Sequence, residues 1–143
     1  EIDYMIHYQE IVREEIEVMN LGQEVNYLVE KSDYSGPNIF LDHDENDQTT
    51  LHYLKMKKFK ETYERRFLDD VYGLLEGVKC GIGRAILPHH LFSREKGLKI
   101  SDSKCPIYFP VHLHFYRQPY YSDLHQQVVA HLSEGSKKFL KQN

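Results

Sequence analysis

The sequence predicts an α/β protein whose central module runs in the order strand, helix, strand, helix, strand. Two short apolar runs, "NIFL" at 38–41 and "AILP" at 85–88, are typical of buried strands. Between them, four apolar residues recur at the spacing of one helix face: Val71, Leu74, Leu75 and Val78. Strands that alternate with helices favour a parallel sheet with right-handed crossovers.

The remaining elements of the module follow from local patterns. Residues 49–59 are helix-prone, and "TYERRFLD" at 62–69 alternates as a strand does. The next helix has Asp69 or Asp70 as its N-cap and Gly81 at its C-terminal stop. "GLKI" at 97–100 is a further candidate strand.

Extended and helical segments flank this module on both sides. Strands are expected at four places: 3–8, "EEIEVMNL", "EVNYLVEK" and "VHLHFYR". A terminal helix is expected from Ser122, with a buried stripe of Leu124, Val128, Leu132 and Phe139. We therefore predict two lobes with a cleft, divided into segments 1–34, 35–104 and 105–143.

Composition restricts the class of protein. A chain of 143 residues is the size of one domain, and no run approaches the length of a membrane helix. The net charge of −4, with Lys and Arg spread along the chain, argues against nucleic-acid binding by this piece alone. No secretory signal is visible, and the chain begins inside a strand-like pattern, which suggests that it was cut from a longer protein.

Cysteine and histidine give no metal or cofactor signature. Cys80 and Cys105 are expected to be reduced thiols in the cytosol. Four histidines form two pairs, His89 with His90 and His112 with His114. Because no ligand set at a recognised spacing accompanies them, we expect no metal, no cofactor and no catalytic residue.

The acidic stretch "LDHDENDQTTLHYLKMKKFK" at 41–60 allows three interpretations. Calcium binding fails because Asp47 stands where the EF-hand turn needs glycine and Tyr53 where it needs a carboxylate. Paired catalytic carboxylates, Asp44 with Asp47, would need a geometry that sequence proximity does not provide. The favoured interpretation is that the acids cap amides at a helix N-terminus, while the following lysines complement its C-terminal end.

The run "DDVYGLLEGVKCGIGRAILPHHLF" at 69–92 resembles the signature region of the effector-binding domain of LysR-type transcriptional regulators. Gly81, Gly83, Leu87 and Pro88 match its Gly-x-Gly turn and its strand ending in Leu-Pro. "EIDYMI" at the start, "NIFLDHDENDQTTL" and the closing strand and helix extend the similarity over nearly the whole chain.

The resemblance implies a type 2 periplasmic-binding-protein fold, in which two α/β lobes are joined by two crossing strands. The chain would hold one complete lobe, 35–104, and part of a second. It would lack a winged helix-turn-helix, a linker helix and roughly half of the first lobe.

The resemblance also implies an effector site between the lobes. Carried over residue by residue, it comprises His7, Tyr8, Gln9, Asp44, Gln48, Thr49, Asp70, Val71, Tyr72 and Leu87. Arg84 departs from the family, which usually has an apolar residue there. A cation at the start of a buried strand needs a partner, and Asp69 or Asp70 is the expected one. The sharper hypothesis is that Arg84 holds the carboxylate of an acidic effector.

The sequence thus predicts a non-enzymatic, cytoplasmic ligand sensor, the effector-binding domain of a LysR-type regulator. Its expected partners are a small-molecule effector such as an organic acid, further copies in a homo-dimer or tetramer, DNA only through the missing domain, and no membrane. The alternative of the same fold is a solute-binding protein of a transport system, and a small hydrolase is a third class. Exposed strand edges left by the missing half of the first lobe predict self-association of this fragment.

Overall fold

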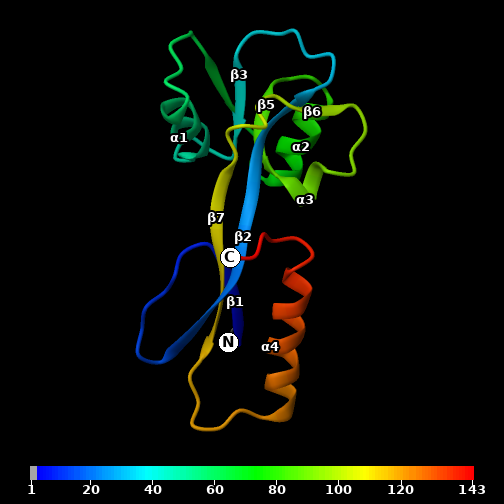
Figure 1. Cartoon of the computed structure of the whole chain (residues 1–143). Helices are drawn as coiled ribbons and strands as arrows, with labels where there is room; N and C mark the ends of the chain where they lie inside the picture. The colour runs from blue at the N-terminus through cyan, green and yellow to red at the C-terminus, as the bar shows by residue number, and fades with distance from the viewer. Residues whose placement is uncertain (1–2) are drawn as a thin grey trace. The chain divides into compact units, whose positions relative to one another are not determined.

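The computed structural model describes residues 3–143, which form two compact units (Figure 1). One unit comprises the chain up to Val25 together with Tyr108–Asn143, and the other is Asn26–Ile107. Ile2 of the expected Ile-Asp pair lies outside the described residues.

The second unit is built on a mixed sheet. Strand β2 (Ile16–Lys31) enters this unit at its C-terminal half, and the strand order from it is β2-β5-β3-β4, with β6 (Leu98–Ile100) on the other side of β2. Strand β3 (Ile39–Asp42) pairs in parallel with both β4 (Glu64–Phe67) and β5 (Arg84–Pro88), whereas β2 is antiparallel to β5. The predicted parallel module is confirmed.

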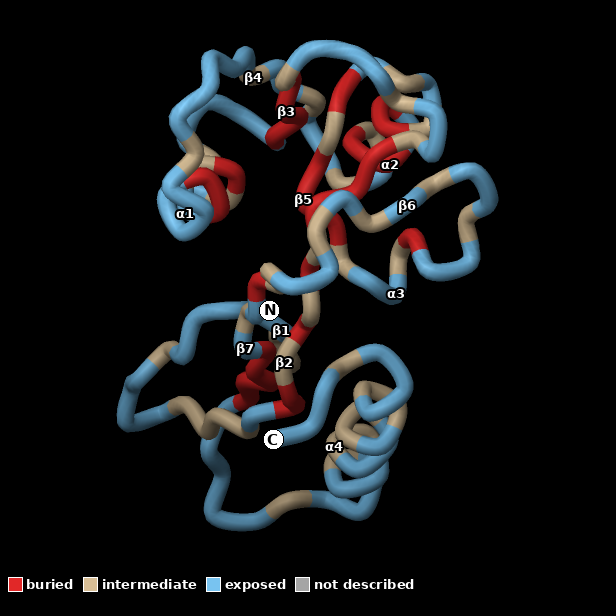
Figure 2. The backbone as a smooth tube through the Cα atoms, turned by 45° about the horizontal axis from the view of Figure 1, so that its top comes forward, coloured by how far each residue is buried: buried red, intermediate tan, exposed pale blue. Residues whose placement is uncertain are grey.

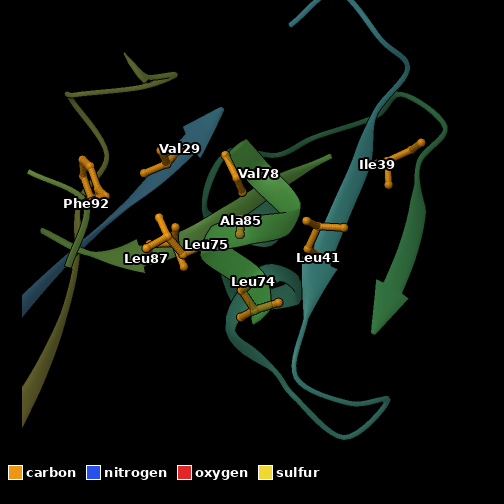
Figure 3. Close-up of a cluster of buried hydrophobic side chains, with 9 residues drawn as sticks. All are labelled: Val29, Ile39, Leu41, Leu74, Leu75, Val78, Ala85, Leu87 and Phe92. Atoms are coloured by element: carbon orange, nitrogen blue, oxygen red, sulfur yellow. The ribbon is translucent and has the colours of Figure 1, made fainter. Parts of the chain in front are cut away.

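Helices α1 (Thr49–Met56) and α2 (Val71–Lys79) connect these parallel strands, and a short helix α3 (His89–Phe92), which the sequence did not predict, follows β5. The predicted stripe of α2 packs onto the sheet, as Figure 3 shows for Leu74, Leu75 and Val78. These side chains and residues of β2, β3, β5 and α3 form one buried cluster: Val29, Ile39, Leu41, Leu74, Leu75, Val78, Ala85, Leu87 and Phe92. On the other face of β3, Phe40 contacts the ring of Phe59 just after α1, with ring centroids 6.0 Å apart.

Both ends of α2 are capped by the residues that the sequence indicated. Asp70 is the N-cap, and Gly81, with φ of +73°, follows the C-cap in the left-handed conformation that favours glycine. Gly81 N–H donates to Val78 O at 2.9 Å and Ile82 N–H donates to Gly77 O at 3.0 Å. These two bonds are those of a Schellman motif, so the helix stops here and the chain turns into β5.

The first unit contains a three-stranded sheet in the order β1-β7-β2 and helix α4 (Asp123–Ser136). Strand β1 (Tyr4–His7) pairs antiparallel with β7 (Ile107–Tyr116), which begins before Pro110 rather than after it. The two strands expected at 14–21 and 24–31 are one continuous strand, β2, which passes through Gly22 at φ of +127°. A small core forms around Leu21, Val111, Leu113 and Phe115.

The predicted buried stripe of α4 is wrong at two of its four positions. Leu124 is 71 % exposed, and Phe139 is 60 % exposed and lies beyond the end of the helix. The face toward the sheet carries His125 instead, whose ring stacks on Tyr121 at 4.3 Å and whose Nδ1 lies 2.9 Å from the Tyr4 hydroxyl. Because an aromatic imidazole occupies the core-facing position, the apolar pattern of this helix was misleading.

Val129 and Leu132 complete the contact of α4 with the core, although no residue of the helix is fully buried, as Figure 2 shows. No helix among residues 3–143 is both long and apolar enough to cross a membrane.

The same leucine truncation should have different effects on stability in α2 and in α4. Leu74→Ala leaves a cavity in the cluster beneath α2 and should lower the free energy of unfolding by about 3 kcal/mol. Leu124→Ala, the same substitution at an exposed position, should change it by less than about 0.5 kcal/mol. Chemical denaturation measures both. Equal losses for the two variants would contradict the position of Leu124.

Candidate functional site

The candidate site is the edge of the second unit where the parallel strands β3 and β4 end and helices α1 and α2 begin. Ligands collect at this edge in open α/β sheets, because loops and helix N-termini present backbone N–H groups there. Strands β3 and β4 are in parallel register, with Asp42 opposite Phe67, so the two loops that follow them emerge side by side.

A buried carboxylate holds this edge together. The Asp42 side chain is 3 % exposed, and its Oδ2 accepts a hydrogen bond from Arg65 Nε at 2.6 Å. Its Oδ1 accepts a hydrogen bond from the Thr50 hydroxyl, also at 2.6 Å. Burying a carboxylate is costly unless both oxygens are satisfied, and here a cation and a hydroxyl satisfy them. Asp42 therefore joins β3 to β4 and to the first turn of α1.

The loop from His43 to Gln48 is folded around two aspartates. Asp44 Oδ1 accepts from Asn46 N at 2.8 Å and from Asp47 N at 3.0 Å. Asp47 Oδ1 accepts from Thr49 N at 2.8 Å, and its other oxygen accepts from His43 N at 3.3 Å. The prediction that acids cap amides before this helix is confirmed, although the N-cap residue itself, Gln48, makes no side-chain capping bond.

These bonds also fix the ionisation of Asp47. Burial works to raise the pKa of the Asp47 carboxyl, but hydrogen bonds from Thr49 and His43 outweigh it, and the pKa lies below its usual value. Arg65 Nη2 donates to Asp47 O at 2.6 Å, which ties the loop back to β4.

The second loop is closed in the same way. Asp70 Oδ1 accepts from Tyr72 N and from Gly73 N, each at 2.8 Å. His43 Nδ1 lies 3.2 Å from Asp69 O, so the loops before α1 and α2 touch. The structure thus brings together at one edge five of the expected site residues: Asp44, Gln48, Thr49, Asp70 and Tyr72.

Leu87 and Val71 do not offer their side chains to this edge. Leu87 is fully buried in the core cluster, and Val71 packs against the same cluster. Leu87 could therefore contact a ligand only through its backbone, whereas Val71 is partly buried. Their positions in the chain could be carried over from the resemblance, but the direction of each side chain could not.

Arg84 lies at the opposite end of β5 from Leu87, and its partner is not the expected one. Arg84 Nε is 2.9 Å from Glu30 Oε2, without the alignment of a hydrogen bond, and Glu30 also pairs with Lys99 at 3.3 Å. Neither Asp69 nor Asp70 is that partner. Glu30 lies on β2, the strand next to β5, so sheet pairing brings the two side chains together. The role of Arg84 in effector binding stays a prediction.

His7, Tyr8 and Gln9 belong to the first unit. His7 Nδ1 accepts from Gln9 N at 3.0 Å, and the Tyr8 hydroxyl donates to Glu24 Oε2 at 3.0 Å. Burial, with the negative charge of Glu24 and the hydrogen bond to it, raises the pKa of Tyr8 to about 12. Tyr8 therefore stays a neutral hydrogen-bond donor throughout the physiological range.

Sequence reasoning missed Asp42, Thr50 and Arg65 as members of this edge. The strand pattern of "TYERRFLD" held a signal for Arg65, because alternation places Arg65 and Phe67 on one face and Arg66 on the other. Among residues 3–143, no group of three or more His, Cys, Asp or Glu could hold a metal ion.

No known protein-family model matches the sequence, and no curated protein matches it. Solved structures do match in fold. The C-terminal domains of a LysR family protein from Agrobacterium tumefaciens superpose with a TM-score of 0.85 at 13 % identity, covering 99 % of this chain and 76 % of that one. This chain therefore has the α/β, periplasmic-binding-protein-like fold of LysR regulatory domains.

Two further structures are of regulators bound to small molecules. Full-length LysG from Corynebacterium glutamicum with bound effector Arg matches with a TM-score of 0.78 and 14 % identity over 96 % of this chain. The regulatory domain of CcmR from Synechocystis in complex with 2-PG matches with a TM-score of 0.71 and 14 % identity, covering 97 % of this chain and 76 % of that one. This chain spans about half of LysG, 52 % of its length.

Removal of the Arg65 side-chain charge should show how much the edge depends on Asp42. Arg65→Met leaves Asp42 buried and without its cation, and should lower the free energy of unfolding by about 3 kcal/mol. Arg66→Met removes the neighbouring exposed arginine, which pairs with Glu64, and should cost less than about 0.5 kcal/mol. Urea denaturation of both variants measures the difference, and an Arg65→Met variant as stable as Arg66→Met would refute this role.

Proposed function

We propose that this chain is the ligand-sensing domain of a LysR-type bacterial transcription regulator. The observation that carries the proposal is the fold match over 99 % of the chain to LysR regulatory domains. It is supported by two helices that begin at one edge of the mixed sheet, where Asp47 and Asp70 accept hydrogen bonds from their first amides. A sensor needs a rigid binding edge rather than reacting groups, and the aspartates here are engaged in loop hydrogen bonds. The proposed activity is therefore binding without catalysis. The proposed compartment of such a transcription regulator is the cytoplasm.

The proposed effector is a small molecule that binds the residues carried over from the family. The set comprises His7, Tyr8, Gln9, Asp44, Gln48, Thr49, Asp70, Val71, Tyr72, Arg84 and Leu87. Exposed polar side chains and loop amides at the ends of β3 and β4 would contact it directly, while Val71 and Leu87 would contribute backbone groups.

The charge of the edge bears on the class of effector. An organic acid was expected because Arg84 could hold a carboxylate, but Arg84 already pairs with Glu30, a carboxylate that it shares with Lys99. Five carboxylates line the loops before α1 and α2: Asp44, Glu45, Asp47, Asp69 and Asp70. Their field favours a ligand with a basic group over an anion, so a basic amino acid is the second candidate.

Regulation would follow from a shift in population. A ligand that prefers one geometry of the domain stabilises that geometry by its difference in affinity, and a homo-dimer or tetramer would pass the change to DNA-binding domains on the same polypeptides. The alternative, a solute-binding protein of a transport system, has the same fold class, but the three structures described above are all of transcription regulators.

A thermal-shift comparison tests the proposal. L-Lysine, L-arginine, succinate and glutarate serve as probes of the two charge classes. At a hundredfold excess over Kd, a bound probe should stabilise the protein by about 2.7 kcal/mol, a rise in Tm of roughly 5–10 °C. Absence of any shift by all four probes at millimolar concentration would count against this effector assignment.

Variants then locate the site. Gln48→Ala and Tyr72→Ala remove exposed side chains from the edge and should abolish most of the shift. Glu76→Ala, one turn further along α2 and also exposed, is the matched control and should leave the shift unchanged. Equal responses of Tyr72→Ala and Glu76→Ala would place binding elsewhere.

A further inference from the structure

The segment 8–15, which leads from β1 to β2, contacts the first unit through one residue in its middle. Ile11 is the only residue of this segment that is not exposed. Its backbone N–H donates to His114 Nε2 on β7 at 3.1 Å. At the end of the segment, Glu15 O accepts from Arg117 N at 2.8 Å. The middle of the segment is therefore held by a hydrogen bond to an imidazole, a group that titrates near physiological pH.

The hydrogen bond from Ile11 fixes the protonation state of His114. A backbone N–H can only donate, so Nε2 is the unprotonated nitrogen of a neutral ring and the ring proton lies on Nδ1. His114 is 3 % exposed, and its Nδ1 is buried without an acceptor among residues 3–143. A proton added at Nε2 would point at the Ile11 N–H, and the ring would become a buried charge without an acceptor at either nitrogen. His114 can therefore take up a proton only if its bond to Ile11 breaks.

His112, two residues earlier on the same face of β7, is held in the same state. Its Nε2 lies 3.3 Å from Asn20 Nδ2. Because Asn20 Oδ1 accepts from Gly22 N at 3.0 Å, the amide is oriented so that Nδ2 donates to the ring. The Nδ1 of His112 is also buried without an acceptor in the described part of the chain. Two neighbouring rings, with centroids 6.1 Å apart, are thus both built into the structure in the neutral form.

The charged and titratable groups around the two rings supply no replacement acceptor. Glu24 on β2 accepts from the Tyr8 hydroxyl. Asp3 and Arg13, which line a cavity beside His114, are exposed and opposite in charge. The set on the neighbouring strands and on segment 8–15 comprises Asp3, His7, Glu10, Arg13, Glu17 and Glu24. None of these groups accepts a hydrogen bond from either buried Nδ1, so no carboxylate offsets proton uptake by the closed structure.

We propose that His114 is a pH-sensitive latch for the segment 8–15. While the ring is neutral, Nε2 accepts the Ile11 N–H and the segment is closed. Below about pH 6.5, where an imidazole in water takes up a proton, protonation of Nε2 releases Ile11 and the segment opens. The closed form is thus most stable above this pH and loses stability as the pH falls. The latch does not depend on the proposed function, although Tyr8 and Gln9 of the proposed effector set lie in the segment that it holds.

Hydrogen exchange of the Ile11 amide, followed by NMR and corrected for the intrinsic exchange rate, tests the latch. Between about pH 7.5 and about pH 5.5, the opening equilibrium at Ile11 should rise about tenfold, the factor expected when one imidazole is protonated only in the open form. His114→Gln replaces the ring by a side-chain carbonyl that can accept from Ile11 but does not titrate, and should remove this pH dependence. An opening equilibrium that is the same at both pH values in the wild-type protein would overturn the proposal.

Two control variants remove other histidines. His131→Gln changes an exposed histidine of α4, and His7→Gln removes the exposed imidazole that accepts from Gln9 N. Both should keep the tenfold dependence at Ile11. A dependence that survives in His114→Gln, or that disappears in His7→Gln, would assign the titration to another group and overturn the latch.

A measurement on the wild-type protein decides the matter if His114→Gln does not fold. The ring ¹⁵N shifts of His114 report which nitrogen carries the proton. At about pH 7.5 they should show a neutral ring with the proton on Nδ1. A proton on Nε2 at that pH would contradict the hydrogen bond from Ile11 and the latch with it.

Discussion

The buried carboxylate of Asp42 is the interaction on which the second unit depends. It sits at the carboxyl end of β3, where a parallel strand must release the chain into a loop, and it binds Arg65 on β4 and Thr50 in α1 at once. The ion pair gains little over water by itself, because desolvation offsets most of the Coulombic attraction. Its importance is geometric, since three elements must be in register for both oxygens to be satisfied.

The shape of the candidate site follows from that anchor. Once Asp42 and Arg65 are joined, Arg65 also holds the backbone of Asp47, and Asp47 caps Thr49. Asp70 closes the neighbouring helix in the same way, so both helix N-termini are fixed before any ligand arrives. A preorganised edge of this kind would lose little entropy on binding, which suits the proposed sensing function.

Patterns within a single element could be predicted from the sequence. Three features of α2 are confirmed: its apolar stripe, its N-cap at Asp70 and its stop at Gly81. Each of them depends on contacts between residues no more than about four positions apart in the chain. Partners between elements could not be predicted, because they depend on strand register. Glu30 reaches Arg84 since β2 and β5 are neighbours, a pairing that no local pattern contains.

The same distinction applies to the candidate site. Asp44 and Asp70 could be placed before helices from the local sequence pattern alone. The inward direction of Leu87 and the hydrogen bonds of Asp42 could be seen only in the folded sheet. In α4, an imidazole that packs like an aromatic ring displaced the expected leucine from the core face, and hydrophobic periodicity cannot anticipate that exchange.

Amide hydrogen exchange with and without L-arginine or succinate tests most directly whether this edge binds a small molecule. Ligand binding should slow exchange in the loops and first turns at 43–51 and 69–74, and leave the C-terminal end of α2 unchanged. Slower exchange confined to other segments would contradict the assignment of the site. Unchanged exchange at a saturating concentration of a compound that raises the melting temperature of the protein would contradict it as well.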